Sequence, residues 1–374
     1  MTNLFFYGPL RLPDLARCVL GRDIALMPAE LAGYRTVWAD GEGFPMLVAD
    51  PGARATGVLA QGLGDADLAR LDFYQGAFAC EVRDLSVETG QGPAPAQVHF
   101  PCDAAWQPGA DWDLEDWART WGPLTLLAAA EIMRAYGRES AADVAQRFGI
   151  IRARAQSFVR AQARARPATL SSPLSRADIR VDRLERPYEK FFGIEEYQAA
   201  FRRFDGSWSR PGQRAIFRAA DAVTVLPYDP ARDLVMLVEQ LRMGPYAHGD
   251  PQPWLLEPIA GIVDAGETYE QTARREAREE AHIDLTGLHH IAGYYPSPGG
   301  VAQFLVSYLG LADLAEGGRR SGGLDHEGED IRNILVPFDT LLEMLESGEL
   351  ANAPLILSVQ WLARNRDALR AQSA

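Results

Sequence analysis

The sequence predicts an α+β protein of two domains joined by a helical segment. Residues 3–103 alternate short apolar runs with Gly and Pro, residues 106–167 are rich in Ala, Arg, Leu and Trp, and the remainder alternates strand-like with helix-like segments. A length of 374 residues, with 47% hydrophobic and 24% charged residues, suits two globular domains. We expect domains at residues 1–105 and 176–374, with a helical connector and linker at 106–175.

The first domain is expected to be a small β-barrel or α+β module of short strands. The strand-like runs are LFFYG, TVWA, MLVAD, TGVLAQGL, CEVRDLSVE and AQVHF. In GDADLARLDFYQG, Leu68 and Leu71 stand at helical spacing, so a short helix is predicted there with Asp65 as its N-cap.

The middle of the chain predicts helices, followed by a linker in ATLSSPLSRAD. Its arginines indicate a solvated helix face, with a nucleic-acid stripe as the alternative. Beyond Ile179, AVTVLPYD and LVMLVEQLR flank a turn at DPARD. The strands HHIAGYY and QFLVSYLGL and the helices FDTLLEMLESGEL and PLILSVQWLARNRDALR follow. This order predicts a mixed sheet sandwiched by helices.

Composition excludes several classes of function. The formal charge of −14 argues against general binding of nucleic acid or of anionic membranes. Lys190 is the only lysine, so no GxxxxGK[ST] phosphate-binding loop exists. The three cysteines form no CxxC pair, and the chain shows neither a signal peptide nor a membrane-length apolar run. We therefore expect a cytoplasmic protein whose partner is a small molecule.

The most informative segment is GIVDAGETYEQTARREAREEAHI, from Gly261 to Ile283. Thr268 and Gln271 form a capping box, so a helix is predicted to begin there, after a turn at Gly266. The helix carries three carboxylates along one edge and an opposite alanine stripe that can press onto a sheet. These residues are Glu276, Glu279, Glu280, Ala273, Ala277 and Ala281. Such a cluster suits Mg²⁺; the alternative is a solvated helix whose acids are neutralised by Arg274, Arg275 and Arg278.

The segment resembles the Nudix box, GX5EX7REUXEEXGU with U apolar. It has Gly261, then five residues, Glu267, seven residues and the run REAREE. One fixed position differs, because His282 replaces the second glycine, which normally ends the helix in a left-handed conformation. The resemblance extends from about Ile179 to Arg370 and is nearest to ADP-ribose pyrophosphatases, including those associated with tellurite resistance. It implies a Nudix α/β/α sandwich with a mixed sheet.

The resemblance also implies Mg²⁺-dependent hydrolysis of ADP-ribose to AMP and ribose 5-phosphate. Two or three Mg²⁺ ions are implied, with Mn²⁺ as an alternative. The implied ligands are the carbonyl of Ala260 with Glu276, Glu280 and Glu329. Glu327 in the loop LDHEGEDI resembles the general base, and Glu279 is assigned to catalysis beside it. An exposed acidic turn is the alternative for that loop.

Five residues are implied to bind the substrate: Phe191, Arg214, Arg242, Pro298 and Gln303. Phe191, with Phe192 beside it, resembles the aromatic residue that stacks on adenine, and the arginines resemble those that reach phosphate or ribose. A pair of core phenylalanines and surface ion pairs are the alternatives. Gln303 stands where bacterial relatives place a glutamate. Glu267 and Arg275 are expected to pair and to brace the loop that begins at Gly261.

The first domain resembles the γ-glutamylcyclotransferase-like family through Tyr7-Gly8-Pro9-Leu10, GFPMLV and LDFYQG. The resemblance implies a pocket that includes Tyr7, Gly8, Leu10 and Gln75. Gln75 occupies the position of the family's proton-transferring glutamate, and a neutral amide cannot act as a general base. The domain is therefore expected to be a degenerate binding or assembly module; a tight turn after the first strand is the alternative.

Two further hypotheses for the whole chain stay open. One is a non-catalytic metabolite sensor, and the other is a Nudix hydrolase of a different nucleoside diphosphate derivative. Related Nudix enzymes exchange N-terminal strands across a dimer, so the resemblance implies a homodimer through the Nudix domain.

Overall fold

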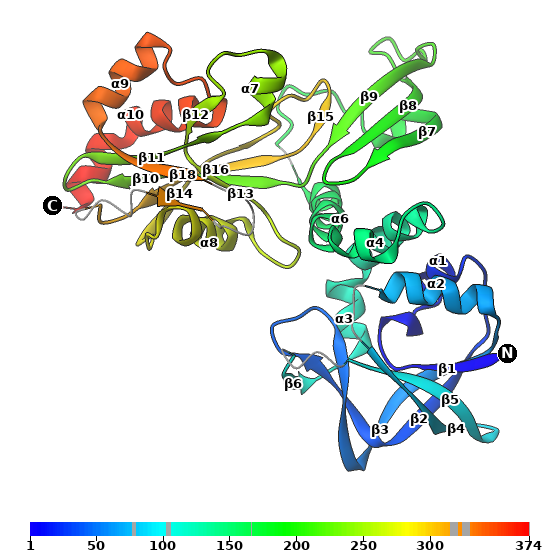
Figure 1. The fold of residues 1–374 in the computed structure, drawn as a ribbon. Helices are drawn as coiled ribbons and strands as arrows, with labels where there is room; N and C mark the ends of the chain where they lie inside the picture. The colour runs from blue at the N-terminus through cyan, green and yellow to red at the C-terminus, as the bar shows by residue number, and fades with distance from the viewer. Residues whose placement is uncertain (77–79, 102–105, 166, 315–320, 324–329, 374) are drawn as a thin grey trace. The chain divides into compact units, whose positions relative to one another are not determined.

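The computed structural model describes residues 1–76, 80–101, 106–165, 167–314, 321–323 and 330–373. The chain divides into two compact units, Met1–Ala165 and Arg166–Ala374 (Figure 1). Within the described ranges, no helix is long and apolar enough to cross a membrane.

The first unit is built on a closed barrel. Its strands are β1 (Thr2–Phe6), β2 (Leu26–Ala39), β3 (Pro45–Leu63), β4 (Cys80–Thr89), β5 (Gly92–Pro101) and β6 (Pro108–Asp111). The order β3-β1-β5-β4-β2 closes because β3 also pairs with β2, and β6 adds to β2. The predicted small barrel is confirmed.

Two runs that the sequence predicts as separate short strands, MLVAD and TGVLAQGL, belong to the single long strand β3. Separate strands were therefore the wrong interpretation. Strand β3 pairs with β2 along nearly its whole length, and a register shift between Ala32 and Tyr34 accommodates the Pro51-Gly52 step. Such an irregularity is where a strand tolerates proline.

The first unit contains the helices η1 (Pro9–Arg11), α1 (Pro13–Leu20), α2 (Asp65–Gln75), α3 (Leu114–Thr120), α4 (Gly122–Ala135), α5 (Ala141–Ala145) and α6 (Phe148–Ala163). The helical middle of the chain is thus confirmed as helix. The N-cap of α2 is Gly64 and not Asp65, because Asp65 is already helical and Gly64 is extended. The carboxylate of Asp67 accepts the N–H of Gly64 at 2.9 Å.

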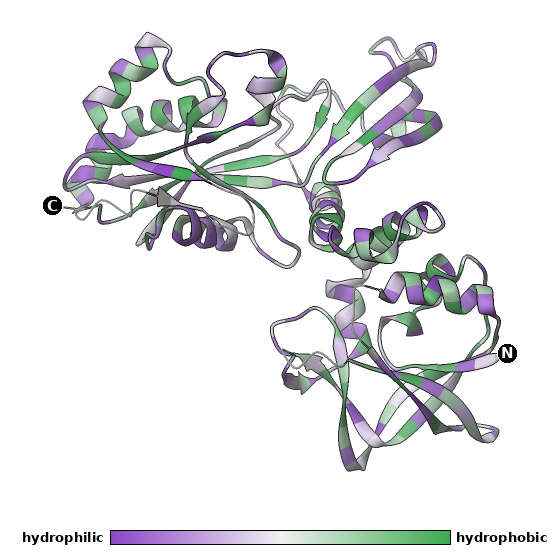
Figure 2. Ribbon diagram, in the orientation of Figure 1, coloured by the Kyte–Doolittle hydropathy of each residue, from purple (hydrophilic) through white to green (hydrophobic). Residues whose placement is uncertain are grey.

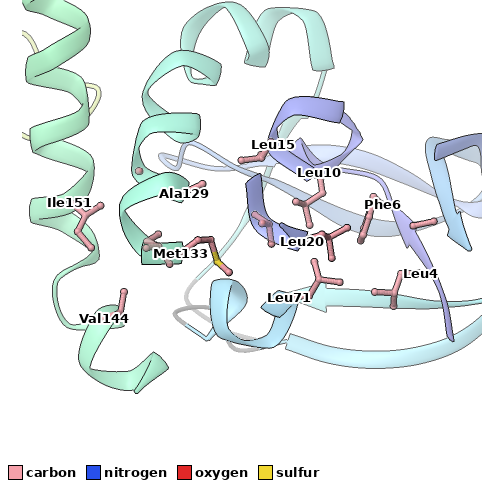
Figure 3. Close-up of a cluster of buried hydrophobic side chains, with 14 of the residues drawn as sticks. Leu4, Phe6, Leu10, Leu15, Leu20, Leu71, Ala129, Met133, Val144 and Ile151 are labelled. Atoms are coloured by element: carbon pink, nitrogen blue, oxygen red, sulfur yellow. The ribbon is translucent and has the colours of Figure 1, made fainter. Parts of the chain in front are cut away.

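Helices α4 and α6 pack within the first unit. Leu124, Ile132 and Ile151 are buried in one cluster with β1, η1, α1 and α2, part of which Figure 3 shows. The segment expected to be a connector therefore contributes to the core of this unit. The predicted solvated arginine face does not hold for Arg154, which is 2% exposed and is ion-paired with the buried Glu131.

The second unit contains a mixed main sheet in the order β14-β16-β10-β11-β18-β17, with β12 on β11 and β13 on β10. The strands are β10 (Ala222–Asp229), β11 (Leu234–Leu241), β12 (Trp254–Glu257), β13 (Ile259–Ile262), β14 (Gly287–Tyr294), β16 (Leu305–Leu311), β17 (Ser321–Gly322) and β18 (Ile331–Pro337). The DPARD turn between β10 and β11 is confirmed by Asp229, which accepts the N–H groups of Ala231 and Arg232.

Helices cover both faces of this sheet. The helices are α7 (Met243–His248), α8 (Tyr269–Ala281), α9 (Phe338–Ser347) and α10 (Ala353–Ser373). Helix α8 lies on one face, and α9 and α10 lie on the other (Figure 1). The predicted α/β/α sandwich is confirmed. Side chains alternate along β10, so that Val223 and Val225 face α8 while Leu226 and Tyr228 face α9 and α10.

A second, four-stranded sheet has the order β15-β9-β8-β7; its strands β7, β8 and β9 precede the main sheet in the chain, and β15 lies between β14 and β16. Its strands are β7 (Ile179–Glu189), β8 (Gly193–Phe201), β9 (Gly212–Arg218) and β15 (Val301–Ala302), and η2 (Arg176–Asp178) leads into β7. Residues 219–221 connect β9 to β10. This short segment bonds to the second sheet, because Ala219 donates its N–H to the carbonyl of Ala302 on β15. It also bonds next to the main sheet, because the carbonyl of Asp221 accepts the N–H of Val263 directly after β13. The carbonyl of Ala220 accepts the side-chain amide of Gln303.

Candidate active site

Helix α8 begins where the sequence predicts. Gly266 adopts φ +95° in the preceding turn. The hydroxyl of Thr268 then accepts the N–H of Gln271, and the side chain of Gln271 accepts the N–H of Thr268. The capping box is confirmed, and it fixes the start of the helix that carries the three carboxylates.

Two of the three carboxylates lie on the buried side of α8. Glu276 is 9% exposed and Glu280 is 3% exposed, next to the fully buried stripe Ala273, Ala277 and Ala281. The stripe presses onto the sheet, as predicted. The expectation that the acids lie opposite it was wrong, because positions 276 and 280 share the sheet-facing side with 273, 277 and 281 at 3.6 residues per turn. In Figure 2, α8 is otherwise largely hydrophilic.

Both buried acids meet strand β13. The N–H of Ala260 donates to Oε2 of Glu280 at 3.3 Å. A Cβ atom at Gly261 would lie 1.8 Å from Oε1 of Glu276, so any other residue there would overlap this carboxylate. The structure thus brings Ala260, Glu276 and Glu280 together, and glycine is required at 261 because of this close approach.

Arg275 links the loop to the helix. Its Nε and Nη2 each donate to Glu267 at 3.0 Å, and its Nη1 donates to Glu276 at 2.7 Å and to Glu279 at 2.9 Å. The expected pairing of Glu267 with Arg275 is present. Burial acts to raise the pKa of Glu267, but the hydrogen bonds from Arg275 and Thr272 outweigh it and leave that pKa below its usual value. Burial also opposes the charge on Arg275, yet these acids raise its pKa.

His282 ends α8 in the left-handed conformation, with φ 56° and ψ 36°. This is the conformation that the family glycine would adopt, so the histidine preserves the geometry of the helix end. Glu327 and Glu329, the predicted base and distal ligand, lie outside the described residues. Among the described residues no group of three or more His, Cys, Asp or Glu side chains could hold a metal ion.

Aromatic side chains gather at the turn between β7 and β8. Phe191 is 51% exposed and meets Phe192 edge-to-face at 4.8 Å, and Phe192 contacts Phe217 at 4.6 Å. The alternative of two core phenylalanines is therefore wrong for Phe191. Phe217 donates its N–H to Gly300, which places the aromatic group beside the loop that contains the exposed Pro298.

The other predicted substrate residues differ in how they are held. Arg214 on β9 is exposed and donates to the carbonyl of Gln213. Arg242 donates from Nε to the buried Glu257 at 2.7 Å, so the ion-pair alternative applies to it, although its side chain stays 40% exposed. Gln303 donates to the carbonyl of Ala220 at 2.9 Å.

Three supporting residues were not identified from the sequence. Asn333 donates to the carbonyl of Glu280, Glu257 holds Arg242, and Asp221 accepts the Tyr269 hydroxyl at 2.7 Å. Each is separated by at least 15 residues from its partner. The apolar run at residues 253–261, PWLLEPIAG, held a usable signal for Glu257, since a carboxylate within a buried apolar run needs a partner.

In the first unit, the structure brings Tyr7, Gly8, Leu10 and Gln75 to one cavity. The family-like segments after β1 and at the end of α2 therefore meet, as the sequence resemblance implies. Gln75 presents its amide to this cavity in place of a carboxylate.

Comparison with known proteins matches both units. Residues 218–358 match the NUDIX domain, and residues 4–119 match the family described as gamma-glutamyl cyclotransferase, AIG2-like. An ADP-ribose pyrophosphatase from Escherichia coli K12 is 34% identical over 207 residues, which are 55% of this chain and 97% of the relative. An ADP-ribose pyrophosphatase from Haemophilus influenzae is 35% identical over 51% of this chain and 88% of the relative. A GDP-mannose pyrophosphatase from Salmonella arizonae is 32% identical over 40% of this chain and 77% of the relative.

Proposed function

The chain belongs to the Nudix hydrolase family, and from this premise we propose that it hydrolyses ADP-ribose to AMP and ribose 5-phosphate. The observation that carries the proposal is the alignment, at 34% identity, with 97% of the length of an ADP-ribose pyrophosphatase. Support comes from the geometry of α8, whose buried acids Glu276 and Glu280 meet the Ala260–Gly261 backbone. A pure binding module has no need for two like charges buried side by side.

Nudix hydrolases use divalent cations, and the residues present fit Mg²⁺. The donor set is made of oxygen atoms, which hard cations prefer. Ala260 would contribute its carbonyl and Glu276 and Glu280 their carboxylates, while Glu329 would complete the set. We propose two or three Mg²⁺ ions, with Mn²⁺ as a substitute. When bound, the metal polarises the phosphoryl oxygens and lowers the pKa of coordinated water.

Three side chains of this protein are proposed to have separate roles in the reaction. Glu327 is proposed to take the proton from the attacking water. Glu279, which accepts from Arg275 at 2.9 Å, is proposed to support the same step from the helix. Arg275 orients two carboxylates and Glu267 at once, which keeps the acids in place before substrate arrives.

Phe191 is proposed to stack on the adenine. Its 51% exposure at the turn between β7 and β8, where it meets Phe192 edge-to-face, supports this role. Arg214 and Arg242 are proposed to contact phosphate or ribose. Pro298 and Gln303 are proposed to line the end of the substrate site away from the adenine. The hydrogen bond from Gln303 to Ala220 supports a fixed position for this side chain.

The decisive experiment is a panel of nucleoside diphosphate sugars with the purified chain and Mg²⁺. ADP-ribose is expected to give AMP and ribose 5-phosphate fastest, and a chelator is expected to abolish the reaction. GDP-mannose belongs in the panel because GDP-mannose pyrophosphatases are among the relatives. A higher kcat/KM for GDP-mannose would establish the second candidate. Tight binding of ADP-ribose without turnover would establish a sensor.

Substitution at Phe191 tests the substrate pose. Phe191→Leu is expected to raise KM for ADP-ribose about 10-fold, since stacking on a base is worth roughly 1–3 kcal/mol. Phe204→Leu is the matched control, because Phe204 is 92% exposed and lies outside the proposed site. An unchanged KM in Phe191→Leu would contradict adenine stacking there.

A homodimer of the second unit is also proposed. The β7–β8 pair exposes Ile179 at 52% and Phe201 at 48%, directly opposite each other, and Val181 at 47%. Adjacent exposed apolar side chains support an interface. Light scattering of the full chain measures the oligomeric state.

The acidic charge of −14 and the free thiol of Cys18 support a cytoplasmic location without nucleic-acid or membrane partners. The link to tellurite resistance stays a prediction.

A further inference from the structure

The carboxyl-terminal end of α8 is bonded to the main sheet by a residue of β18. The last carbonyls of an α-helix have no partner within the helix. Two of them accept here from the turn that ends α8, through the N–H groups of His282 and Ile283 at 3.0 and 3.1 Å. The carbonyl of Glu280 instead accepts Nδ2 of Asn333 at 3.2 Å, from 53 residues away in the chain. Asn333 therefore ties the peptide of a proposed metal ligand to the sheet.

Strand β17 approaches the same peptide. Gly322, which pairs with Ile331 of β18, lies so near that a Cβ atom there would stand 1.6 Å from the carbonyl oxygen of Glu280. The same Cβ atom would stand 3.4 Å from Nδ2 of Asn333. A side chain at position 322 would thus displace the end of α8, and glycine leaves room for the carbonyl and its donor.

Other contacts of α8 fix different parts of the helix. At its start, the Tyr269 hydroxyl donates to Asp221 at 2.7 Å. Arg274 and Arg278 lie nearer the end, but they donate to residues 284–285, in the segment that follows the helix. The stripe that faces the sheet consists of alanines, whose short side chains form shallow ridges that interlock little with a neighbour. The contacts at β17 and β18 are therefore well placed to set where the last turn lies on the sheet.

The carboxylate of Glu280 depends on the place of this turn. The residue is 3% exposed, and its Oε2 accepts the N–H of Ala260 at 3.3 Å. The carbonyl of Ala260 and the carboxylates of Glu276 and Glu280 are proposed ligands of one cation site. Mg²⁺ demands a nearly ideal octahedral arrangement of oxygen atoms, so a displaced last turn would weaken its binding.

We propose that Asn333 is a positioning residue for the cation site. By holding the carbonyl of Glu280, it sets the place of the carboxylate on the same residue. Gly322 contributes by leaving room for that carbonyl. The inference rests on the proposed Mg²⁺-dependent hydrolysis and adds a residue that acts on the cation through Glu280.

Mn²⁺ is the probe, and its binding to the full chain is measured by electron paramagnetic resonance without substrate. Asn333→Leu has nearly the same size but no donor, and it is expected to weaken Mn²⁺ binding about 10-fold, as loss of a residue that orients a metal ligand typically does. Asn365→Leu is the matched control, because Asn365 also donates to a helix carbonyl, that of Trp361 on α10, at 2.7 Å. The control is expected to retain the wild-type affinity.

Gly322→Ala tests the same peptide from the other strand. The added methyl group would overlap the carbonyl of Glu280, so Mn²⁺ binding is expected to weaken in this variant too. Because both substitutions displace one peptide, the effects of Gly322→Ala and Asn333→Leu are expected to be less than additive in the double variant. Gly90→Ala is the control, since a Cβ atom there meets open space.

Kinetics separates positioning from general destabilisation. In Asn333→Leu, the Mg²⁺ concentration that gives half of the maximal kcat is expected to rise about 10-fold. The KM for ADP-ribose at saturating Mg²⁺ is expected to stay at the wild-type value. Asn333→Ser is too short to reach the carbonyl and is expected to behave alike, so it replaces Asn333→Leu if the latter does not fold. Thermal unfolding without a cation shows which variants are folded.

The outcomes separate this inference from the proposed function. Wild-type Mn²⁺ affinity in folded Asn333→Leu or Asn333→Ser, alongside weakened binding in Glu280→Gln, would overturn the positioning role and leave the metal assignment in place. If the wild type binds Mn²⁺ and Asn333→Leu weakens that binding, but no nucleoside diphosphate sugar is hydrolysed, the proposed function fails and the positioning role stands. Absence of Mn²⁺ binding to the wild type would overturn both.

Discussion

At the residue scale, Gly261 stands at a position that leaves no room for a side chain. A methyl group there would stand 1.8 Å from a carboxylate oxygen of Glu276. The absence of a side chain lets a buried acid reach the backbone of β13, where Ala260 already contacts Glu280. Two acids from adjacent turns of one helix thus meet one peptide segment, which is the arrangement expected of an oxygen-rich cation site.

Glu280→Gln is expected to preserve the fold and to lower kcat about 10²-fold or more. The amide keeps the shape of the side chain but removes the charge that would hold the metal stabilising the phosphate in the transition state. The measurement is AMP formation at saturating Mg²⁺. Glu346→Gln, an exposed position on α9, is the control. Wild-type turnover in Glu280→Gln would contradict the metal assignment.

Glu327→Gln is expected to lower kcat with little change in KM. A general base acts in the transition state and contributes little to binding of the ground state. Steady-state kinetics with ADP-ribose separates the two constants. If KM rises alone, Glu327 binds substrate and another group takes the proton.

His282→Gly is expected to stabilise the second unit by about 1 kcal/mol, because a left-handed backbone costs a non-glycine residue roughly 1–2 kcal/mol. The corresponding rise in Tm is about 2–4 °C. His248→Gly is the control, since His248 lies in the right-handed helix α7 and glycine there is expected to destabilise. Equal shifts in both variants would show that the conformation of His282 carries no strain.

Local patterns predict contacts well when both partners lie close together in the sequence. The Thr268–Gln271 box spans three residues and the Glu267–Arg275 pair spans eight, and both were predicted. Partners brought together by the sheet were not predictable in this way, and Asn333, which holds the carbonyl of Glu280 from 53 residues away, is an example. The N-cap of α2 was misassigned because Asp65 and Asp67 both have capping side chains, and only the structure shows which one reaches Gly64.

At the element scale, α8 and its preceding loop behave as one piece. Arg275 contacts the loop through Glu267 and the carbonyl of Ile262, and the helix through Glu276 and Glu279. The loop therefore cannot move without breaking contacts to the helix that carries the acids. This coupling makes the ionised form of Glu267 a contributor to stability.

The stability that Glu267 contributes is expected to be lost in acid. Its pKa is below the usual 4.5 because the bonds from Arg275 and Thr272 outweigh burial. A group with a lowered pKa in the folded state stabilises fully above its unfolded pKa and loses that effect as pH falls through the folded value. The difference in unfolding free energy between wild type and Glu267→Gln should thus be constant from pH 7 to about 5.5 and shrink below about pH 4.5. Urea unfolding at several pH values measures it; a constant difference down to pH 3 would contradict the ion pair.

Elements with a strong one-sided apolar pattern were predictable, and weakly patterned ones were not. Strands β10, β11 and β16 and helices α9 and α10 follow from their apolar runs. Strand β7 was not identified individually, because its residues are almost all exposed and charged residues recur along it. Strand β3 was divided in two, since Pro51-Gly52 reads as a break although pairing with β2 carries the strand through it.

At the scale of the whole molecule, the helices at 114–163 change the description of the first unit. Composition separates them from the strands, so a connector was the natural interpretation. Their apolar side chains are buried against β1 and α1, and α3, α4 and α6 also close the wall of the cavity. Sequence periodicity shows that a helix has an apolar face but does not show which surface covers it.

The intact protein is expected to release no 5-oxoproline from γ-glutamyl substrates, because Gln75 cannot move a proton and such help is worth about 10²–10⁴-fold. Gln75→Glu is expected to restore at most a trace, since Pro9 also removes a backbone donor from the loop after β1. Robust release by the unmodified chain would require another acid. Glu81 is a poor substitute, because it is exposed and its hydrogen bond from Arg83 lowers its pKa.

The barrel also bears on resistance to aggregation. Because β3 pairs with both β1 and β2, its five-stranded ring offers another chain no free strand edge among the described residues, apart from the short β6. The second unit cannot rely on closure, since β7 ends its sheet. Charged residues alternate along β7, where Arg180 pairs with Asp182 and Arg183 with Glu185. These charges make it unfavourable for a strand of another molecule to pair with the β7 edge. One polypeptide thus suppresses fibre-like association by closure in one half and by charge in the other.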